Sequence, residues 1–183
     1  MTQESKKSLG TLSDYVLLGC SGLRVLPLCL GTMTFGENWG FGANFEECKE
    51  VFDHYFEQGD TANLYTGGDP ASAELGIGTV PWGFLAEGRV KDSWEKNWEI
   101  LDEVKKISKE VNRSPVQVAL NWIAQKPGIT SSLIGARTKA QLVENIKALE
   151  FKLTPEQINR LDNVSEPPMS FPQSFYGFGP GKV

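Results

Sequence analysis

The run SSLIGARTKAQLVENI at residues 131–146 decides the fold, because its hydrophobic pattern changes from that of a short apolar strand to that of an amphipathic helix. Gly135 separates the two, and Arg137 begins a first turn that also holds a threonine and a glutamine. Free backbone N–H groups and the positive end of the helix dipole favour an anion at such a turn, and an arginine holds a phosphate through two parallel hydrogen bonds. The run therefore predicts a strand, a glycine turn and a helix that together form a phosphate site, for which a nucleotide is the natural occupant.

The same residues also permit a purely structural interpretation. Thr138 and Gln141 have the spacing of a capping box, in which each side chain accepts a hydrogen bond from the other residue's backbone N–H. On this run alone, the nucleotide site and the simple helix cap remain alternatives.

Three other runs accompany this one along the chain. They are LCLGTMTFG at residues 28–36, DTANLY at residues 60–65 and VPWGFLAEG at residues 80–88. Together the four runs resemble the aldo-keto reductases, most closely the branch that includes bacterial and fungal reductases and the potassium-channel β subunits. The resemblance extends over about residues 14–165. It implies an α/β fold of the (β/α)8, or TIM-barrel, type.

The sequence predicts that this barrel is incomplete. The run LGIG at residues 75–78 continues directly into TVPW at residues 79–82, which resembles the seventh strand of the family. Strands three to six have no counterpart in the sequence, and a complete barrel takes roughly 250 residues or more, whereas the chain has 183. The expected domain keeps the N-terminal hairpin, the first strand–helix unit, the last two βα units and the C-terminal helices. Residues 1–13 are expected to form a disordered lead-in and residues 166–183 an irregular tail.

Local signals predict the individual elements. A hairpin is expected over residues 15–25 and a buried strand over residues 26–32, where the apolar residues are continuous. A helix over residues 44–58 has Asn44 as its N-cap. Its expected apolar stripe consists of Val51, Phe52, Tyr55 and Phe56.

Three more helices are predicted in the C-terminal half. The first covers residues 93–110, and its spaced apolar residues are more typical of packing than of a cofactor site. The other two cover residues 115–125 and 155–163. Both begin with an N-cap hydroxyl, a proline at the first helical position and a glutamine at the third.

Composition limits the class of protein. A length of 183 residues with a net charge of −5 fits a single domain with a core of ordinary size. The mild acidity argues against a nucleic-acid partner, which requires clustered Lys and Arg. Without a long apolar run or a secretory signal, the protein is expected to be cytoplasmic and to have no membrane partner. The three cysteines form no CxxC pair and predict neither a disulfide framework nor a metal site.

The resemblance implies that the cofactor is NADPH or NADP, and it assigns residues to each part of that molecule. The nicotinamide is assigned Gly31, Thr32 and Met33, the pyrophosphate Leu85 and Gly88, the 2′-phosphate Gly135 and Arg137, and the adenine Gln141 and Asn145. An arginine near the ribose phosphate favours NADPH over NADH. For Asn145, a solvated helix residue remains the alternative.

The catalytic residues are only partly present. In the resembled family a tyrosine donates the proton, a lysine paired with an aspartate lowers the pKa of that tyrosine, and a histidine orients the carbonyl group. Asp60 and Tyr65 match this motif. No lysine follows the motif before Lys91, and the one histidine, His54, precedes it and is expected to be a half-exposed helix residue. Without the lysine the phenol keeps a pKa near 10, so the sequence predicts at most feeble reduction of a small carbonyl substrate.

Three hypotheses follow. The chain is a shortened NADPH-dependent oxidoreductase, a catalytically inactive relative that binds a nucleotide or another protein, or a truncated product that does not fold stably. In each case an incomplete barrel exposes strand edges, and self-association through these edges would cover them.

Overall fold

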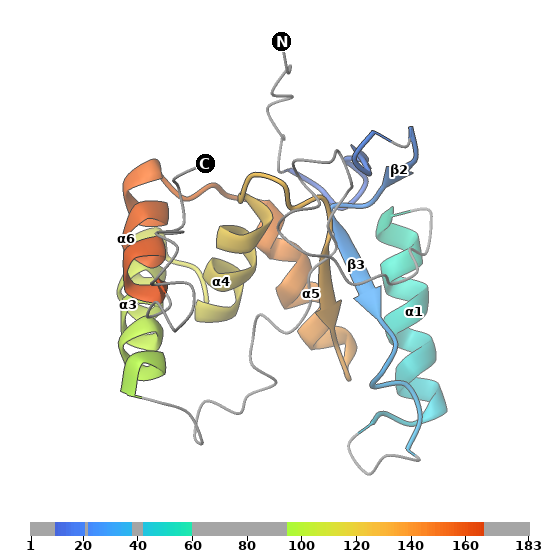
Figure 1. The fold of residues 1–183 in the computed structure, drawn as a ribbon. Coiled ribbons are helices and arrows are strands. Elements are labelled where there is room, and N and C mark those ends of the chain that lie inside the picture. Colours follow the sequence, from blue (N-terminus) through green and yellow to red (C-terminus); the bar gives the residue numbers. More distant parts are fainter. Residues whose placement is uncertain (1–9, 21, 38–41, 60–94, 167–183) are drawn as a thin grey trace, which may run out of the picture.

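The computed structural model describes residues 10–20, 22–37, 42–59 and 95–166 of the chain (Figure 1). Within these residues the fold is of the α/β class, and no helix there is long and apolar enough to cross a membrane. In chain order the elements are β1 Val16–Leu17, β2 Arg24–Val25, β3 Leu28–Gly31, α1 Phe45–Gly59, α3 Glu95–Val111, α4 Pro115–Ala124, β4 Ser132–Gly135, α5 Lys139–Ile146, the 3-10 helix η3 Lys147–Leu149 and α6 Pro155–Ser165.

The strands β1 and β2 form the predicted N-terminal hairpin. They pair antiparallel, with Val16 opposite Val25 and Leu17 opposite Arg24. Gly22 beside the turn has a φ of +75°, a conformation that side chains with a Cβ atom rarely adopt. The glycines in this run therefore serve the turn, as the sequence indicated.

The strands β3 and β4 form a separate parallel pair. Their register places Leu28 opposite Ser132 and Gly31 opposite Gly135. The expected strand at 26–32 is confirmed in a shorter form, and the strand–glycine–helix unit of residues 131–146 is confirmed as β4 followed by α5. In Figure 1 both arrows point down, so the two strands end at the same edge.

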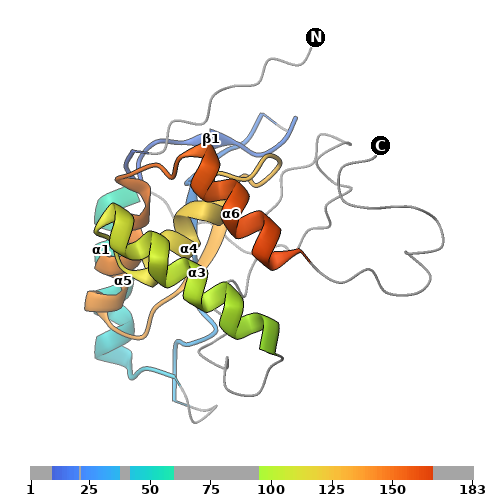
Figure 2. The same cartoon turned by 90° about the vertical axis from the view of Figure 1, so that its left-hand side faces the viewer.

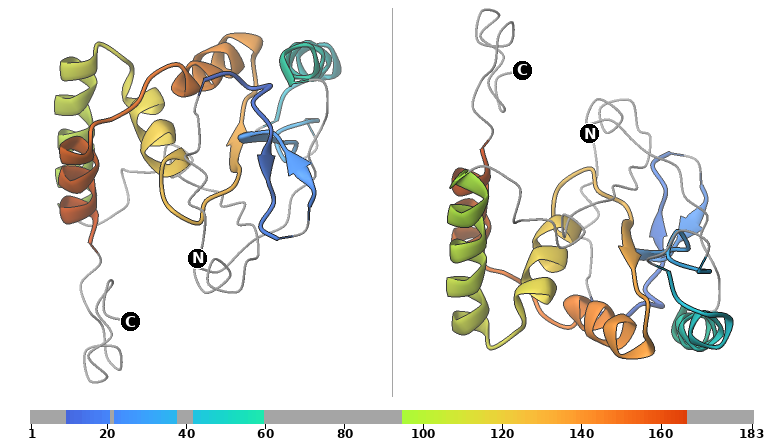
Figure 3. Two further views of the ribbon diagram at one scale, coloured as in Figure 1. Left: turned by 90° about the horizontal axis from the view of Figure 1, so that it is seen from above. Right: turned by 90° about the horizontal axis from the view of Figure 1, so that it is seen from below.

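One hydrophobic core holds this pair against two helices. Leu28 and Leu30 of β3 pack with Val51 and Tyr55 of α1, and Leu142 of α5 joins the same cluster. Figure 3 shows α1 and α5 on the same side of the strands. Each fully buried aliphatic side chain contributes roughly 1.5–3 kcal/mol, so this core fixes both strands.

The helix α1 begins and packs as predicted, except for two aromatic residues. Asn44 and Glu47 form a capping box, with Asn44 Oδ1 accepting from the Glu47 N–H at 3.0 Å and Glu47 Oε2 accepting from the Asn44 N–H at 3.2 Å. Tyr55 is fully buried and donates its hydroxyl to the Leu28 carbonyl at 2.7 Å; burial raises the pKa of this phenol. The expected burial of Phe52 and Phe56 is wrong, because they are 41% and 48% exposed. The strand pair covers only the side of α1 that carries Val51 and Tyr55.

A second cluster joins α3, α4 and α6. Val104 and Ile107 of α3 pack against Val118 of α4 and Leu161 of α6. Figure 2 shows α6 running alongside α3. The packing role predicted for the apolar residues of α3 is confirmed for these two, whereas Trp98 is exposed.

The caps of α4 and α6 follow the sequence prediction in detail. Ser114 and Gln117 form a capping box at the start of α4, and Thr154 and Gln157 form one at the start of α6. In each helix a proline occupies the first turn, where its missing N–H removes no intrahelical hydrogen bond.

A buried asparagine connects α4 to the chain that follows α5. Asn121 is fully buried, and its Nδ2 atom donates to the carbonyls of Ala148 and Phe151, both at 2.7 Å. Its Oδ1 atom accepts from the Leu153 N–H at 3.3 Å. One side chain therefore satisfies three backbone groups between the two core clusters.

An ion-pair network links α3 to α6. Arg160 of α6 donates from Nε to Glu103 at 2.7 Å and from NH1 to Glu110 at 2.8 Å. Hydrogen bonds from Lys106 and Arg160 lower the pKa of Glu103. Hydrogen bonds from Gln157 and Arg160 lower the pKa of Glu110.

We expect this network to make stability depend on pH in acid. Because the folded-state pKa values of Glu103 and Glu110 lie below their ordinary value of 4.5, the contribution of the network is present above that pH and is lost as the pH falls through the lowered values. Thermal melts between about pH 6 and about pH 3 measure the loss. A Glu103→Gln chain, which cannot titrate there, should lose less stability over this range than the parent, while the exposed Glu156→Gln should behave like the parent. Equal losses in all three chains would contradict the assignment.

Candidate functional site

The carboxyl ends of β3 and β4 bring together two of the predicted cofactor segments. Gly31 and Gly135 are the last paired residues of the two strands, so the chain leaves both strands at one edge. Thr32 and Met33 follow the first of them and are exposed, and Arg137 follows the second and is also exposed. In α/β folds, ligands bind at the edge where parallel strands end, and this edge is therefore the candidate site.

Hydrogen bonds hold the two loops of this edge in place. Thr34 Oγ1 donates to the Ala136 carbonyl at 3.3 Å and so links the loop after β3 to the loop after β4. Asn145 of α5 donates from Nδ2 to the Gly135 carbonyl at 3.2 Å. Neither contact was expected from the sequence, although Thr34 lies in the loop that follows the strand and Asn145 lies one turn from the core residue Leu142, on the same face of the helix.

The position of Asn145 settles one of the open alternatives. Its side chain is 4% exposed, so its interpretation as a solvated helix residue is wrong. Asn145 supports the end of β4 from the helix side through its bond to Gly135. Contact of Asn145 with an adenine ring stays a prediction.

The first turn of α5 combines a cap with open donor groups. Thr138 Oγ1 accepts from the Gln141 N–H at 3.3 Å, as the capping interpretation predicts. The oxygen of the Gln141 side chain accepts instead from the Arg137 N–H at 2.9 Å, one residue before the N-cap. Among the described residues, neither Nε2 of Gln141 nor the Arg137 guanidinium has a bonding partner, so both groups can donate to a ligand.

The electrostatics of this turn favour an anion. Arg137 and Lys139 are both exposed, and the sequence holds no acidic residue from Ser131 to Val143. The positive end of the α5 dipole adds to their field, and such fields act most strongly within the first helical turn. A phosphate group therefore matches the charge of the site.

The two glycines of the edge have different surroundings. A Cβ atom on Gly31 would lie 3.4 Å from the Ile134 carbonyl oxygen and from the Leu133 side chain, so a side chain at this position would contact the neighbouring strand. A Cβ atom on Gly135 would meet no atom within 4 Å. The backbone of Gly135 is thus open to a ligand, which fits a bound dinucleotide.

Four of the predicted site residues lie outside the described residues. They are Asp60, Tyr65, Leu85 and Gly88. His54 lies on α1, as expected, and its side chain is mostly buried with Nδ1 3.9 Å from a Glu57 carboxylate oxygen. In the described ranges no group of three His, Cys, Asp or Glu side chains could hold a metal ion.

The cysteines offer no reactive thiolate in the core. None of the three cysteines forms a disulfide, and Cys29 on β3 is buried. Burial raises the pKa of the Cys29 thiol to about 11, so this group stays protonated near neutral pH.

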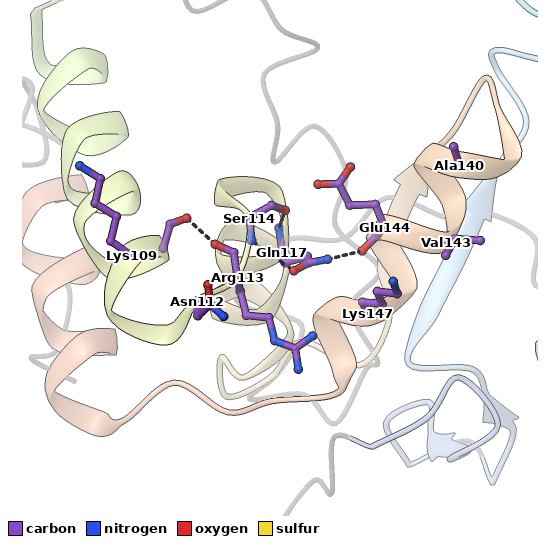
Figure 4. A pocket seen from close by; sticks show the side chains of 10 residues that line it. Lys109, Asn112, Arg113, Ser114, Gln117, Ala140, Val143, Glu144 and Lys147 are labelled. Carbon is purple, nitrogen blue, oxygen red and sulfur yellow. Dashed lines mark hydrogen bonds between the residues drawn. The ribbon is translucent and has the colours of Figure 1, made fainter.

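A polar pocket of about 620 Å³ lies away from the strand edge, between the end of α3, the start of α4 and one side of α5 (Figure 4). The amide group of Gln117 spans its floor, donating to the Glu144 carbonyl at 3.2 Å and accepting from the Ser114 N–H at 3.2 Å. Arg113 pairs with Glu150 at 2.9 Å and stacks over the Phe151 ring. The side chains of Gln117 and Arg113 are thus already bonded within the protein, and none of the residues assigned to the cofactor lines this pocket, so the strand edge remains the better candidate site.

Comparison with known proteins gives a consistent result. A family model described as the aldo/keto reductase family matches residues 70–166. The chain is 41% identical over 69 residues to a putative voltage-gated potassium channel subunit beta of Schizosaccharomyces pombe, a match that covers 35% of this chain and 20% of that protein. It is 32% identical over 111 residues to an uncharacterized oxidoreductase, YrpG, of Bacillus subtilis, covering 52% of this chain and 34% of the relative.

A third relative is a probable aryl-alcohol dehydrogenase, AAD4, of Saccharomyces cerevisiae. The two are 28% identical over 134 residues, which is 61% of this chain and 41% of the relative. The matched part of the chain thus spans between 20% and 41% of the length of these three curated relatives.

Proposed function

Because the chain belongs to the aldo/keto reductase family, we propose that the shared edge of β3 and β4 binds the phosphate end of NADPH. The observation that carries this proposal is the pairing of Gly31 with Gly135, beside an exposed Arg137. At this edge the segment after β3, assigned to the nicotinamide, lies beside the segment after β4, assigned to the 2′-phosphate. The open backbone of Gly135 and the unpaired guanidinium of Arg137 support the same assignment.

We also propose that β3 and β4 are the first and last strands of a (β/α)8 barrel. In a closed barrel these two strands are neighbours and run parallel, which agrees with their pairing. The barrel domain occupies residues 14–165 and lacks central strands. Among the described residues no third strand pairs with β3 or β4, so self-association through their outer edges belongs to the same proposal.

Each residue of the edge has a distinct role in this proposal. Arg137 pairs with the 2′-phosphate, and the first turn of α5 adds its positive dipole end. The Nε2 group of Gln141 donates to the adenine. Asn145 fixes Gly135 from behind, which keeps the turn in position for the phosphate.

The proposed reaction is the reduction of a small aldehyde or ketone. Bound NADPH supplies the hydride for this chemistry. Tyr65 donates the proton to the carbonyl oxygen and Asp60 lies near it in the chain, as the family motif implies. The sequence offers no lysine after this motif until Lys91, so the pKa of the phenol stays high and turnover is slow.

A second candidate function is nucleotide binding without turnover. The position of His54 favours it, because this histidine, the only one in the chain, belongs to α1, where its Nδ1 atom lies 3.9 Å from a Glu57 carboxylate oxygen of the same helix. A histidine at this position on α1 is not one of the residues that form the strand edge.

Fluorescence titration of the full chain with NADPH, followed by a turnover assay with an aldehyde, tests the proposal. We expect saturable binding and turnover slower than that of a complete family member by orders of magnitude. A Gly135→Val variant fills the open space and should weaken NADPH binding roughly tenfold. Since the φ of Gly135 is not positive, this variant should keep the melting temperature of the parent.

The matched control introduces the same side chain away from the strand edge. Asn159→Val substitutes an exposed residue of α6 and should leave the NADPH affinity unchanged. Equal NADPH affinities of the Gly135→Val and parent chains would contradict the proposal. Binding without any detectable turnover would favour the second candidate function.

A further inference from the structure

The solvent-exposed side of helix α1 carries two parallel stripes of side chains, one aromatic and one acidic. Phe45, Phe52 and Phe56 share one face, because their spacing of seven and four residues brings them round to the same side. They are 76%, 41% and 48% exposed. The rings of Phe52 and Phe56 stack with centroids 6.3 Å apart. We call this face the aromatic stripe.

An acidic stripe runs beside the aromatic stripe, shifted by one residue. It consists of Glu46, Glu50, Asp53 and Glu57. Lys49 neutralises Asp53 across 2.6 Å, and the remaining carboxylates of the stripe pair with no lysine or arginine among the described residues. The surface next to the aromatic rings is therefore negative.

The aromatic stripe ends at an apolar hollow. This pocket, of about 360 Å³, is lined by Phe35, Phe45, Cys48, Lys49 and Phe52. Its volume can take one large apolar side chain. An exposed apolar face with an anchoring pocket and a polar rim is typical of a protein-binding surface.

We propose that the aromatic stripe and the hollow bind a basic amphipathic helix of another protein. A helix of that kind lays its apolar face on the phenylalanine rings, places one leucine-sized or larger side chain in the hollow, and sets its lysines and arginines against the acidic stripe. This inference is independent of the nucleotide site at the strand edge, and it goes beyond the proposed function.

The charge of α1 selects this occupant over others. A second copy of the chain that used the same face would bring two acidic stripes together, and the whole chain has a net charge of −5. Anionic lipid surfaces and nucleic acids would be repelled for the same reason. A cationic helix is the partner whose charge complements the rim, which also increases its association rate.

Two labelled peptides test the proposal on the full chain. The first has leucines at helical spacing with lysines at the other positions, and the second has glutamates in place of the lysines. Fluorescence anisotropy should show saturable binding of the lysine peptide, weakened by added salt, and none of the glutamate peptide. A Phe52→Ser/Phe56→Ser variant should bind the lysine peptide roughly tenfold more weakly or worse.

Control variants distinguish binding at the aromatic stripe from nonspecific binding of the peptide. Trp98→Ser removes another exposed aromatic side chain, on α3, and should leave binding unchanged. Glu50→Lys/Glu57→Lys leaves two carboxylates against two lysines in the acidic stripe, which cancels its negative charge and should abolish binding. Thermal melts of the phenylalanine variant should match the parent, because neither ring belongs to the core cluster.

Three outcomes would overturn the proposal. These are equal binding of both peptides, no binding of the lysine peptide, and an unchanged affinity in the phenylalanine variant. Sedimentation equilibrium adds a fourth: a dimer of the parent chain that the phenylalanine variant loses would assign the stripe to a second copy instead.

Discussion

An Arg137→Ala variant will bind NADPH about 2 kcal/mol, or roughly 30-fold, more weakly than the parent chain, and its affinity for NADH will barely change. Hydrogen bonds from a guanidinium to a phosphate are charge-assisted, and NADH lacks the 2′-phosphate that would receive them. Arg137 has no carboxylate partner among the described residues, so its removal leaves no buried charge behind. Calorimetric titration with both nucleotides at one salt concentration measures the difference.

Two further variants control this result. Lys152→Ala removes an exposed positive charge away from the strand edge and should leave both affinities unchanged. Arg137→Lys keeps the charge but loses the forked geometry, and should give an intermediate NADPH affinity. If Arg137→Ala weakened NADPH and NADH equally, the arginine would not contact the 2′-phosphate, and the assignment of the site would fail.

An Asn121→Ala variant will lose about 4 kcal/mol of folding free energy, since each buried backbone group left without a partner costs roughly 1–3 kcal/mol. Asn121 is fully buried and bonds the carbonyls of Ala148 and Phe151 and the N–H of Leu153. Alanine cannot satisfy any of these three groups. Small domains have about 5–15 kcal/mol of total stability, so the variant is expected to be largely unfolded at moderate temperature.

Urea unfolding followed by circular dichroism measures this loss. Asn159→Ala, at an exposed position of α6, removes the same side chain at the surface and should change stability by less than about 0.5 kcal/mol. A loss below about 1 kcal/mol for Asn121→Ala would contradict the role of this side chain, because a single ordinary hydrogen bond accounts for that much.

Local sequence signals were sufficient to predict those elements whose ends are fixed by residues close together in the sequence. The helices that start at Pro115 and Pro155 begin where their caps predict, because the capping residues lie within three positions of each other. The strand–glycine–helix unit was predicted for the same reason. Local signals do not predict the pairing of Gly31 with Gly135, but this pairing agrees with the barrel that the family resemblance implied.

The features that were missed depend on contacts that helical periodicity and capping rules do not specify. Phe52 and Phe56 continue the apolar pattern of α1, but the strand pair leaves them uncovered, and helical periodicity alone does not reveal which neighbours exist. The alternative of a solvated Asn145 was wrong, because this side chain is buried and bonds to Gly135. Of the capping box predicted for Thr138 and Gln141, the hydrogen bond from the Gln141 N–H to the Thr138 hydroxyl is present. The Gln141 side chain accepts from the N–H of Arg137 instead of the N–H of Thr138. The exposure of Phe52 and Phe56 is decided by packing between elements, whereas the Gln141 bond is a choice between two neighbouring N–H groups at one helix start.

The pairing of Gly31 with Gly135 also bears on how such a site evolves. The entropy of closing a flexible loop grows only with the logarithm of its length, and each doubling adds about 0.6 kcal/mol. The chain that connects β3 to β4 can therefore gain or lose whole strand–helix units with little thermodynamic effect on the pair itself. In the proposed barrel, contact between the first and last strands would thus withstand deletions in the middle of the gene, at the cost of exposed strand edges.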